Sequence, residues 1–185
     1  MHTAPATAQP AKALEAASAF ARLYRRWFDD ARGLFEDNKR QARLIAGSPV
    51  VDVLAVWDEG AGCWLADAPT LIRFEELDAA IFAMKGPHIA LFFGSVDTRS
   101  PIAFGSAGAC GRDGGGSRSL RWKSFRPCSY ASGSRVTEIA FNEGPNGLPT
   151  SVQVLLEDGG AFRVSSTGIG FVLEGEPIPS IALAG

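Results

Sequence analysis

The sequence contains few of the residues on which the chemistry of protein sites most often depends. It has three cysteines and two histidines in 185 residues. Cys63, Cys110 and Cys128 are odd in number and widely spaced, which is typical of neither a disulfide framework nor a zinc site. This usage predicts a cytoplasmic protein with no metal and no other cofactor.

Long apolar runs and targeting signals are also missing. No stretch of about eighteen apolar residues is present, so the sequence predicts no membrane span and no membrane partner. The opening "MHTAPATAQPAKA" lacks the apolar stretch of a secretory signal, and we expect residues 1–11 to form a disordered tail. The proline-broken residues 177–185 are expected to form a C-terminal coil.

The residues expected of a hydrolase or a thiol enzyme are sparse. There is no Gly-x-Ser-x-Gly motif, and His88 is the single histidine outside the N-terminal tail. A catalytic set could combine Cys110 or Cys128 with His88 and Asp97, but only if the fold brings them together. A histidine that bonds to the backbone at a strand edge is the better interpretation of His88. The sequence therefore favours a protein that is not an enzyme.

Charge is present in separate blocks. The chain is 46% hydrophobic and 21% charged, with a formal net charge of −2, which suits one domain with a real core. Residues 49–98 carry two basic and eight acidic side chains, whereas residues 99–135 carry seven basic and one acidic. A strongly basic segment therefore lies within a mildly acidic protein.

The N-terminal quarter of the chain has the apolar period of an amphipathic helix, over residues 12–46. A row with steps of three and four residues, in which Asn38 fills the one gap, forms its apolar arc: Leu14, Ala17, Ala21, Tyr24, Phe28, Ala31, Phe35, Ala42 and Ile45. A helix of this length would reach about 50 Å, longer than a domain of this size is wide. We expect either a break near Gly33 or a projecting end.

The two halves of this helical arm, residues 12–48, are expected to have different partners. Gly47 and Pro49 tie the C-terminal half to the first strand, so Leu34, Phe35, Ala42 and Ile45 should pack on the sheet. The N-terminal half then presents Phe20, Tyr24 and Trp27 to a partner protein or to a second copy of the chain. Replacing Phe20 and Trp27 with Asp is accordingly expected to leave the fold intact.

The pattern after residue 49 predicts the rest of an α+β domain, residues 49–176. It begins with a β-hairpin (50–57 and 63–67), a second helix (73–86) and a strand (88–96). A mostly antiparallel β-meander packed against the helices follows, with strands at 120–126, 135–142, 150–158, 161–166 and 168–175.

The stretch "FGSAGACGRDGGGSRS" (104–119) resembles a phosphate-binding loop in its glycine content alone. It contains no lysine, and the "LRWKSF" that follows is typical of a strand rather than a helix. The sequence therefore predicts a mobile Gly-rich surface loop over residues 97–118.

The basic segment is a candidate contact for anions or nucleic acid. Its cations are Arg112, Arg118, Arg121, Lys123 and Arg126, interleaved with Trp122, Phe125 and Tyr130. In a strand, Arg121, Lys123 and Phe125 would share one face, which suits single-stranded nucleic acid. The chain's pI of about 5.7 argues against this, and pairing of the cations with neighbouring acidic segments is the favoured alternative.

Three functions remain open. The leading one is a non-enzymatic protein-interaction, adaptor or accessory domain that acts through its helical arm and sheet. The alternative is an enzyme or small-ligand-binding domain with a pocket under the 97–118 loop. The weakest is binding of single-stranded nucleic acid through residues 112–130.

Overall fold

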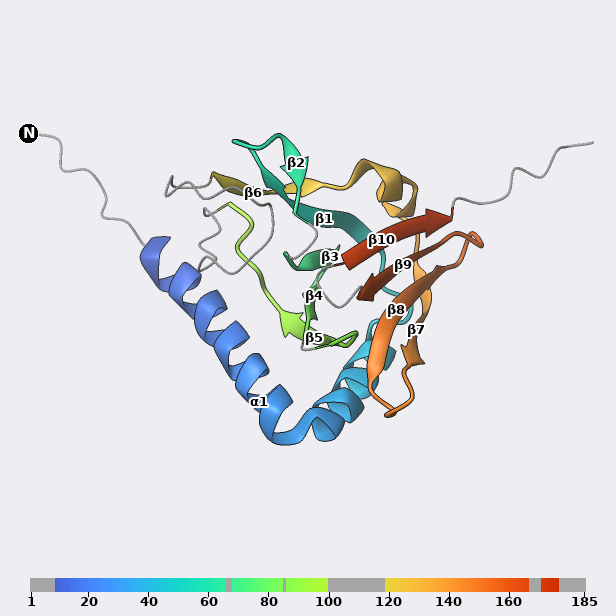
Figure 1. Ribbon diagram of the computed structural model, residues 1–185. Coiled ribbons are helices and arrows are strands. Elements are labelled where there is room, and N and C mark those ends of the chain that lie inside the picture. The colour runs from blue at the N-terminus through green and yellow to red at the C-terminus, as the bar shows by residue number, and fades with distance from the viewer. Residues whose placement is uncertain (1–8, 66–67, 85, 100–118, 167–170, 177–185) are drawn as a thin grey trace, which may run out of the picture.

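The computed structural model describes residues 9–65, 68–84, 86–99, 119–166 and 171–176, with side chains described from residue 22 to residue 166 within these ranges. A helix at the N-terminal side is followed by antiparallel strands in two sheets (Figure 1), so the predicted α+β class is confirmed. The tail 1–8, the loop residues 100–118 and the segment 177–185 lie outside the described residues.

The first sheet has six strands arranged around β1 (Val50–Asp58). Three strands pair antiparallel with β1: β2 (Cys63–Trp64), β3 (Thr70–Phe74) and β6 (Leu120–Ser124). The sheet continues through β4 (Asp78–Ala83) to β5 (Ile89–Gly94). The predicted hairpin is thus confirmed as β1 and β2.

The second sheet is a four-stranded meander in the order β10-β9-β8-β7. Its strands are β7 (Val136–Glu143), β8 (Pro149–Leu156), β9 (Ala161–Ser166) and β10 (Phe171–Glu176). A 3-10 helix, η1 (Arg126–Ala131), leads into it from β6. The predicted meander is confirmed, except that the strand expected at 120–126 belongs to the first sheet because it pairs with β1.

The prediction of a helix at residues 73–86 is wrong, because this segment forms the end of β3 and the whole of β4. The chain reverses at Glu75 and Glu76, where the Phe74 amide donates to the Leu77 carbonyl at 2.9 Å. An apolar run this short fits a helix or a buried strand equally well by spacing. The segment forms a strand rather than a helix because β4 pairs with β3 on one side and with β5 on the other.

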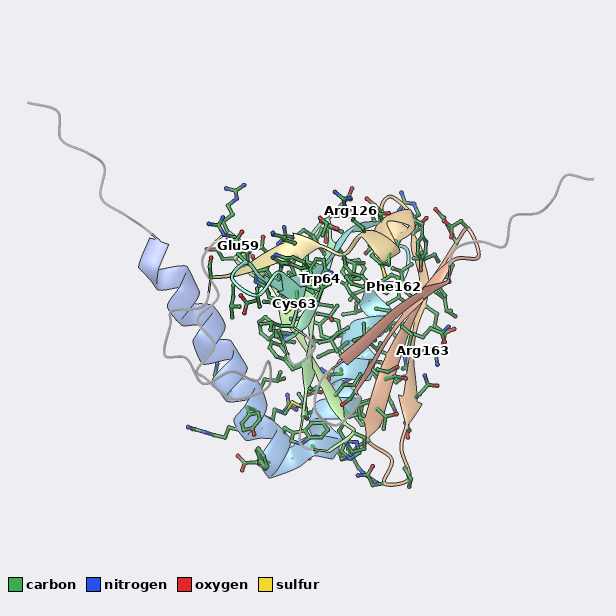
Figure 2. The ribbon with its side chains drawn as sticks, turned by 45° about the horizontal axis from the view of Figure 1, so that its top comes forward. Glu59, Cys63, Trp64, Arg126, Phe162 and Arg163 are labelled. Atoms are coloured by element: carbon green, nitrogen blue, oxygen red, sulfur yellow. The ribbon has the colours of Figure 1, made fainter. Side chains whose placement is uncertain are left out.

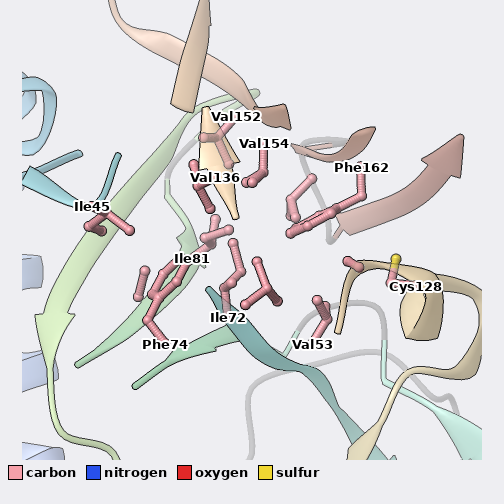
Figure 3. Close-up of a cluster of buried hydrophobic side chains, with 14 of the residues drawn as sticks. Ile45, Val53, Ile72, Phe74, Ile81, Cys128, Val136, Val152, Val154 and Phe162 are labelled. Carbon is pink, nitrogen blue, oxygen red and sulfur yellow. The ribbon is translucent and has the colours of Figure 1, made fainter. Parts of the chain in front are cut away.

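The main core lies between the two sheets (Figure 3). Val53, Ile72 and Ile81 from the first sheet meet Val152 and Phe162 from the second, and each is at most 2% exposed. Ile45, at the end of the helical segment, joins the same cluster. The C-terminal half of the helix therefore packs on the sheets, as predicted, with Leu34, Phe35, Ala42 and Ile45 all buried.

Helix α1 (Gln9–Leu44) bends at Asp30, and its two halves form a V in Figure 1. Asp30 has extended backbone (φ −155°, ψ 69°), and its Oδ1 accepts a hydrogen bond from the Gly33 amide at 2.9 Å, as an N-cap does. A Cβ at Gly33 would lie 2.0 Å from Asp30 Oδ2, so this close approach requires glycine. The predicted break near Gly33 is confirmed, and it lies at Asp30, three residues before Gly33.

The N-terminal half of α1 also contributes to a core cluster. Leu23 and Trp27 pack with Met84, which follows β4, and with Ala90 of β5. Trp27 is only 6% exposed, so the structure places this predicted partner-binding residue in the core rather than on a free surface.

Candidate functional site

Three aromatic side chains gather on one face of the first sheet, where β1, β2 and β6 run together. In the strand register Trp57 lies opposite Trp64 of β2 on one side and opposite Arg121 of β6 on the other. The Trp57 and Trp64 rings are 4.9 Å apart, and Phe125 lies 5.4 Å from Trp64. We call Trp57, Trp64, Phe125, Arg121 and Lys123 the tryptophan face.

The cations of this face surround the rings and are exposed. Arg121 and Lys123 have side chains 67% and 44% exposed, and the Lys123 Nζ lies 5.1 Å above the centre of the Trp57 ring. Arg126, also exposed, follows at the start of η1. Glu59, Trp64 and Arg126 all lie in the upper part of Figure 2. The predicted sharing of one strand face by Arg121 and Lys123 is thus observed.

Glu59, in the turn between β1 and β2, is the carboxylate that meets these cations. It lies 3.1 Å from Arg121 Nε and 3.8 Å from Lys123 Nζ, and it accepts a 2.8 Å hydrogen bond from the Ser119 hydroxyl. The Ser119 hydrogen bond, helped by the two cations, lowers the pKa of Glu59 from its usual value. The acidic segment therefore pairs with the basic one, which was the favoured alternative to a nucleic-acid surface.

The outer edge of β6 offers backbone hydrogen bonds. Glu59 N–H donates to the Ser119 carbonyl at 3.0 Å, and Phe125 N–H donates to the Val53 carbonyl at 2.7 Å. By antiparallel alternation, the amide and carbonyl groups of Leu120, Trp122 and Ser124 point away from β1. Within the described part of the chain, β1 is the one strand that pairs with β6.

Of the remaining basic candidates, Arg112 and Arg118 lie outside the described residues. Sequence reasoning missed Trp57 and Trp64 as site residues. A signal was present, because a tryptophan stands on each side of the predicted hairpin turn, and hairpin register can place such residues directly opposite each other.

The thiol and imidazole candidates are engaged in structural contacts. Cys128 is buried in the core between the sheets, and burial raises the pKa of its thiol to about 11. The His88 Nε2 lies 3.0 Å from Asn146 Nδ2, and the ring packs 5.9 Å from that of Trp27. Cys110 lies outside the described residues. Among the described side chains there is no group of three or more His, Cys, Asp or Glu that could hold a metal ion.

Burial of Cys128 makes stability sensitive to alkaline pH. The thiol pKa is 9.0 in its ordinary state and about 11 in the fold, so its contribution to stability is complete below pH 9 and is lost as the pH rises through 11. We expect the wild type to lose more stability across this interval than a Cys128→Ala variant, measured as urea midpoints. Parallel pH profiles for the two proteins would contradict this.

A groove of about 320 Å³ opens between the two halves of α1 and strand β5. Its lining is mixed, with the polar side chains of Arg22, Arg26, Asp37, Asn38 and Gln41 and the apolar side chains of Leu23, Leu34, Leu91, Phe92 and Phe93. Arg26 forms an ion pair with Asp37 across the bend. The pocket predicted under the 97–118 loop depends mainly on residues outside the described part of the chain.

The helical arm presents two aromatic rings on its outer side. Tyr24 is 42% exposed and Phe28 is 56% exposed, with ring centres 4.9 Å apart. Of the predicted partner face, Tyr24 is exposed, Trp27 is buried, and the side chain of Phe20 lies outside the described residues.

No helix in the described residues is long and apolar enough to cross a membrane. Comparison with models of protein families, with curated proteins and with solved structures finds no match to this chain.

Proposed function

We propose that this protein is a non-enzymatic interaction domain that binds an acidic, extended segment of a partner protein along β6 and over the tryptophan face. The observation that carries this proposal is the row formed by Trp64, Trp57 and Arg121 across three strands, beside a strand edge. Tryptophan, tyrosine and arginine are the residues that contribute most binding energy at protein interfaces.

Charge supports an acidic partner. Arg121, Lys123 and Arg126 are exposed together, and Glu59 is the carboxylate with which the first two pair. The surface therefore carries more positive than negative charge, although the whole chain carries a net charge of −2. Carboxylates of a partner segment can replace Glu59 on the guanidinium group or bind beside it.

Backbone geometry supports an extended partner. The outward amides and carbonyls of Leu120, Trp122 and Ser124 match the pattern that an added strand needs. Side chains of that strand would then alternate between the tryptophan face and the opposite side. Charged residues on an edge strand can also serve only to prevent unwanted pairing, and the experiment below separates these two roles.

Ring orientation favours protein over single-stranded nucleic acid. Bases stack on open ring faces, whereas the rings of the tryptophan face meet edge to face, at 76° and 73°. Lys123 also covers one face of Trp57. An acidic pI of about 5.7 further disfavours a nucleic-acid role.

The test is photo-cross-linking in cells with p-benzoylphenylalanine in place of Trp64, which keeps an aromatic ring at that position. We expect one protein to be cross-linked through a segment rich in Asp and Glu, as mapped by mass spectrometry. Arg121→Glu should reduce this adduct by about tenfold or more, because like charges then meet. Arg43→Glu, a matched reversal on α1 outside the tryptophan face, should leave the adduct unchanged.

Three results would overturn the proposal. One is the absence of any specific adduct, which would leave the cations of β6 as edge protection. Another is an adduct that survives Arg121→Glu. The third is an adduct to nucleic acid, detected by nuclease sensitivity.

A further inference from the structure

The N-terminal half of α1 is packed on one side and carries exposed side chains on the other. Leu23 and Trp27 bury one side against Met84 and Ala90. One helical turn apart on the other side, Tyr24 and Phe28 stack edge to face, about half exposed. An aromatic pair held in place in this way loses little side-chain entropy when a second surface covers it.

The charges beside this pair are arranged in a definite order. Arg25 and Asp29 are exposed and follow Tyr24 and Phe28 by one residue each, so they form a parallel row on the same helix surface. Neither is in an ion pair with another described residue, whereas the neighbouring Arg26 is held by Asp37. Read along the helix, the surface therefore has a positive end and a negative end.

We propose that this surface binds a second copy of itself, with two arms crossing antiparallel about a twofold axis near residues 26 and 27. A twofold interface requires a patch that is complementary to itself. Reversal of the helix direction places Tyr24 of one copy opposite Phe28 of the other, and Arg25 opposite Asp29. Each contact occurs twice.

Charge complementarity selects this occupant and this orientation. Parallel pairing of the same arms about a twofold axis would place the charged row of each copy against the aromatic row of the other, so neither Arg25 nor Asp29 would meet an opposite charge. An acidic or a basic partner surface would satisfy one of the two charges and oppose the other. The antiparallel second copy satisfies both and covers the aromatic pair at the same time.

This dimer uses residues on α1 that are distinct from the tryptophan face on β1, β2 and β6. The two proposals can therefore fail independently. Loss of self-association would leave the cross-link from position 64 unchanged, and loss of that cross-link would leave self-association unchanged.

The experiment is analytical ultracentrifugation of the full chain with two charge reversals, Arg25→Asp and Asp29→Arg. We expect the wild type to be a dimer, and the dimer dissociation constant of each variant alone to rise by about tenfold or more, because like charges then meet twice. An equimolar mixture of the two variants should regain the dimer, since one chain is then acidic at both positions and the other is basic at both. Arg43→Asp, a matched reversal elsewhere on α1, should leave the wild-type dimer unchanged.

The mixture gives the decisive result, because both chains in it are variants and neither restores a wild-type surface. Thermal unfolding of each variant checks that the fold is kept. A monomeric wild type would overturn the proposal. So would a dimer that persists in both single variants, or a mixture that stays monomeric.

Discussion

Replacement of Trp27 by alanine is expected to lower the free energy of unfolding by about 3–5 kcal/mol. The indole is 6% exposed and joins α1 to the first sheet through Met84 and Ala90, beside the ring of His88. Its removal leaves a cavity between α1 and the first sheet. Urea denaturation of the purified protein measures the loss.

The matched control is Trp64→Ala, the same truncation at a residue 37% exposed on the tryptophan face. We expect this variant to lose roughly 1 kcal/mol, the scale of the ring contacts that it removes. Equal losses in the two variants would mean that the arm is not packed as described.

This result also bears on the expectation that Phe20→Asp with Trp27→Asp leaves the fold intact. Trp27 belongs to the buried cluster with Leu23 and Leu34, so a carboxylate there would be an unpaired buried charge. The double substitution is now expected to unfold the N-terminal half of α1. Arg25 and Asp29 on the exposed side are the better positions for testing partner binding.

Replacement of Asn38 by alanine is the second large effect, with an expected loss of about 2–4 kcal/mol. The Asn38 amide donates to the Leu91 carbonyl at 2.9 Å, and its oxygen accepts from the Leu91 amide at 3.0 Å. β5 is the outer strand of the first sheet, so this side chain takes the place of a neighbouring strand at residue 91. Alanine would leave both backbone groups buried and unsatisfied.

Two variants sharpen the test of Asn38. Gln41→Ala removes an exposed amide from the groove between α1 and β5, which Asn38 also lines, and should change stability by no more than about 0.5 kcal/mol. Asn38→Asp keeps the acceptor but turns a buried carboxylate oxygen toward the Leu91 carbonyl, so its stability should fall at least as far as that of the alanine variant. Hydrogen exchange at the Leu91 amide should quicken in the alanine variant. Unchanged exchange there would show that the Asn38 contact does not protect the edge.

Local sequence determined much of the fold because periodicity and turn residues act over a few positions. Steps of three and four residues predicted α1. The same row contains Phe35 and Ile45, which are buried, but also Tyr24 and Phe28, which are exposed. The turn residues after Asp58 and Asp158 located hairpins that the strand registers confirm. Alternation along residues 120–124 also separated the exposed Arg121 and Lys123 from the buried Leu120.

Short apolar segments were decided by tertiary contacts instead. Residues 78–83 fit a helix by spacing, yet hydrogen bonds to β3 and β5 satisfy their backbone in a sheet. The bend in α1 depends on both the sequence and the local structure. Excess length predicted a break, and the side chain of Asp30, which caps the second half, set its position.

The candidate sites divide in the same way. The order of Tyr24, Arg25, Phe28 and Asp29 along one helix is a property of the sequence, because helical geometry alone places them on one surface. The tryptophan face is a property of the tertiary structure. Trp57 and Trp64 come from one hairpin, but Arg121 reaches them only because β6 pairs with β1 across about sixty residues of intervening chain. No local sequence pattern predicts the register of β6 on β1. This register buries Leu120 and Val56 in one cluster, and it brings Glu59 to the cations on the opposite face of the sheet.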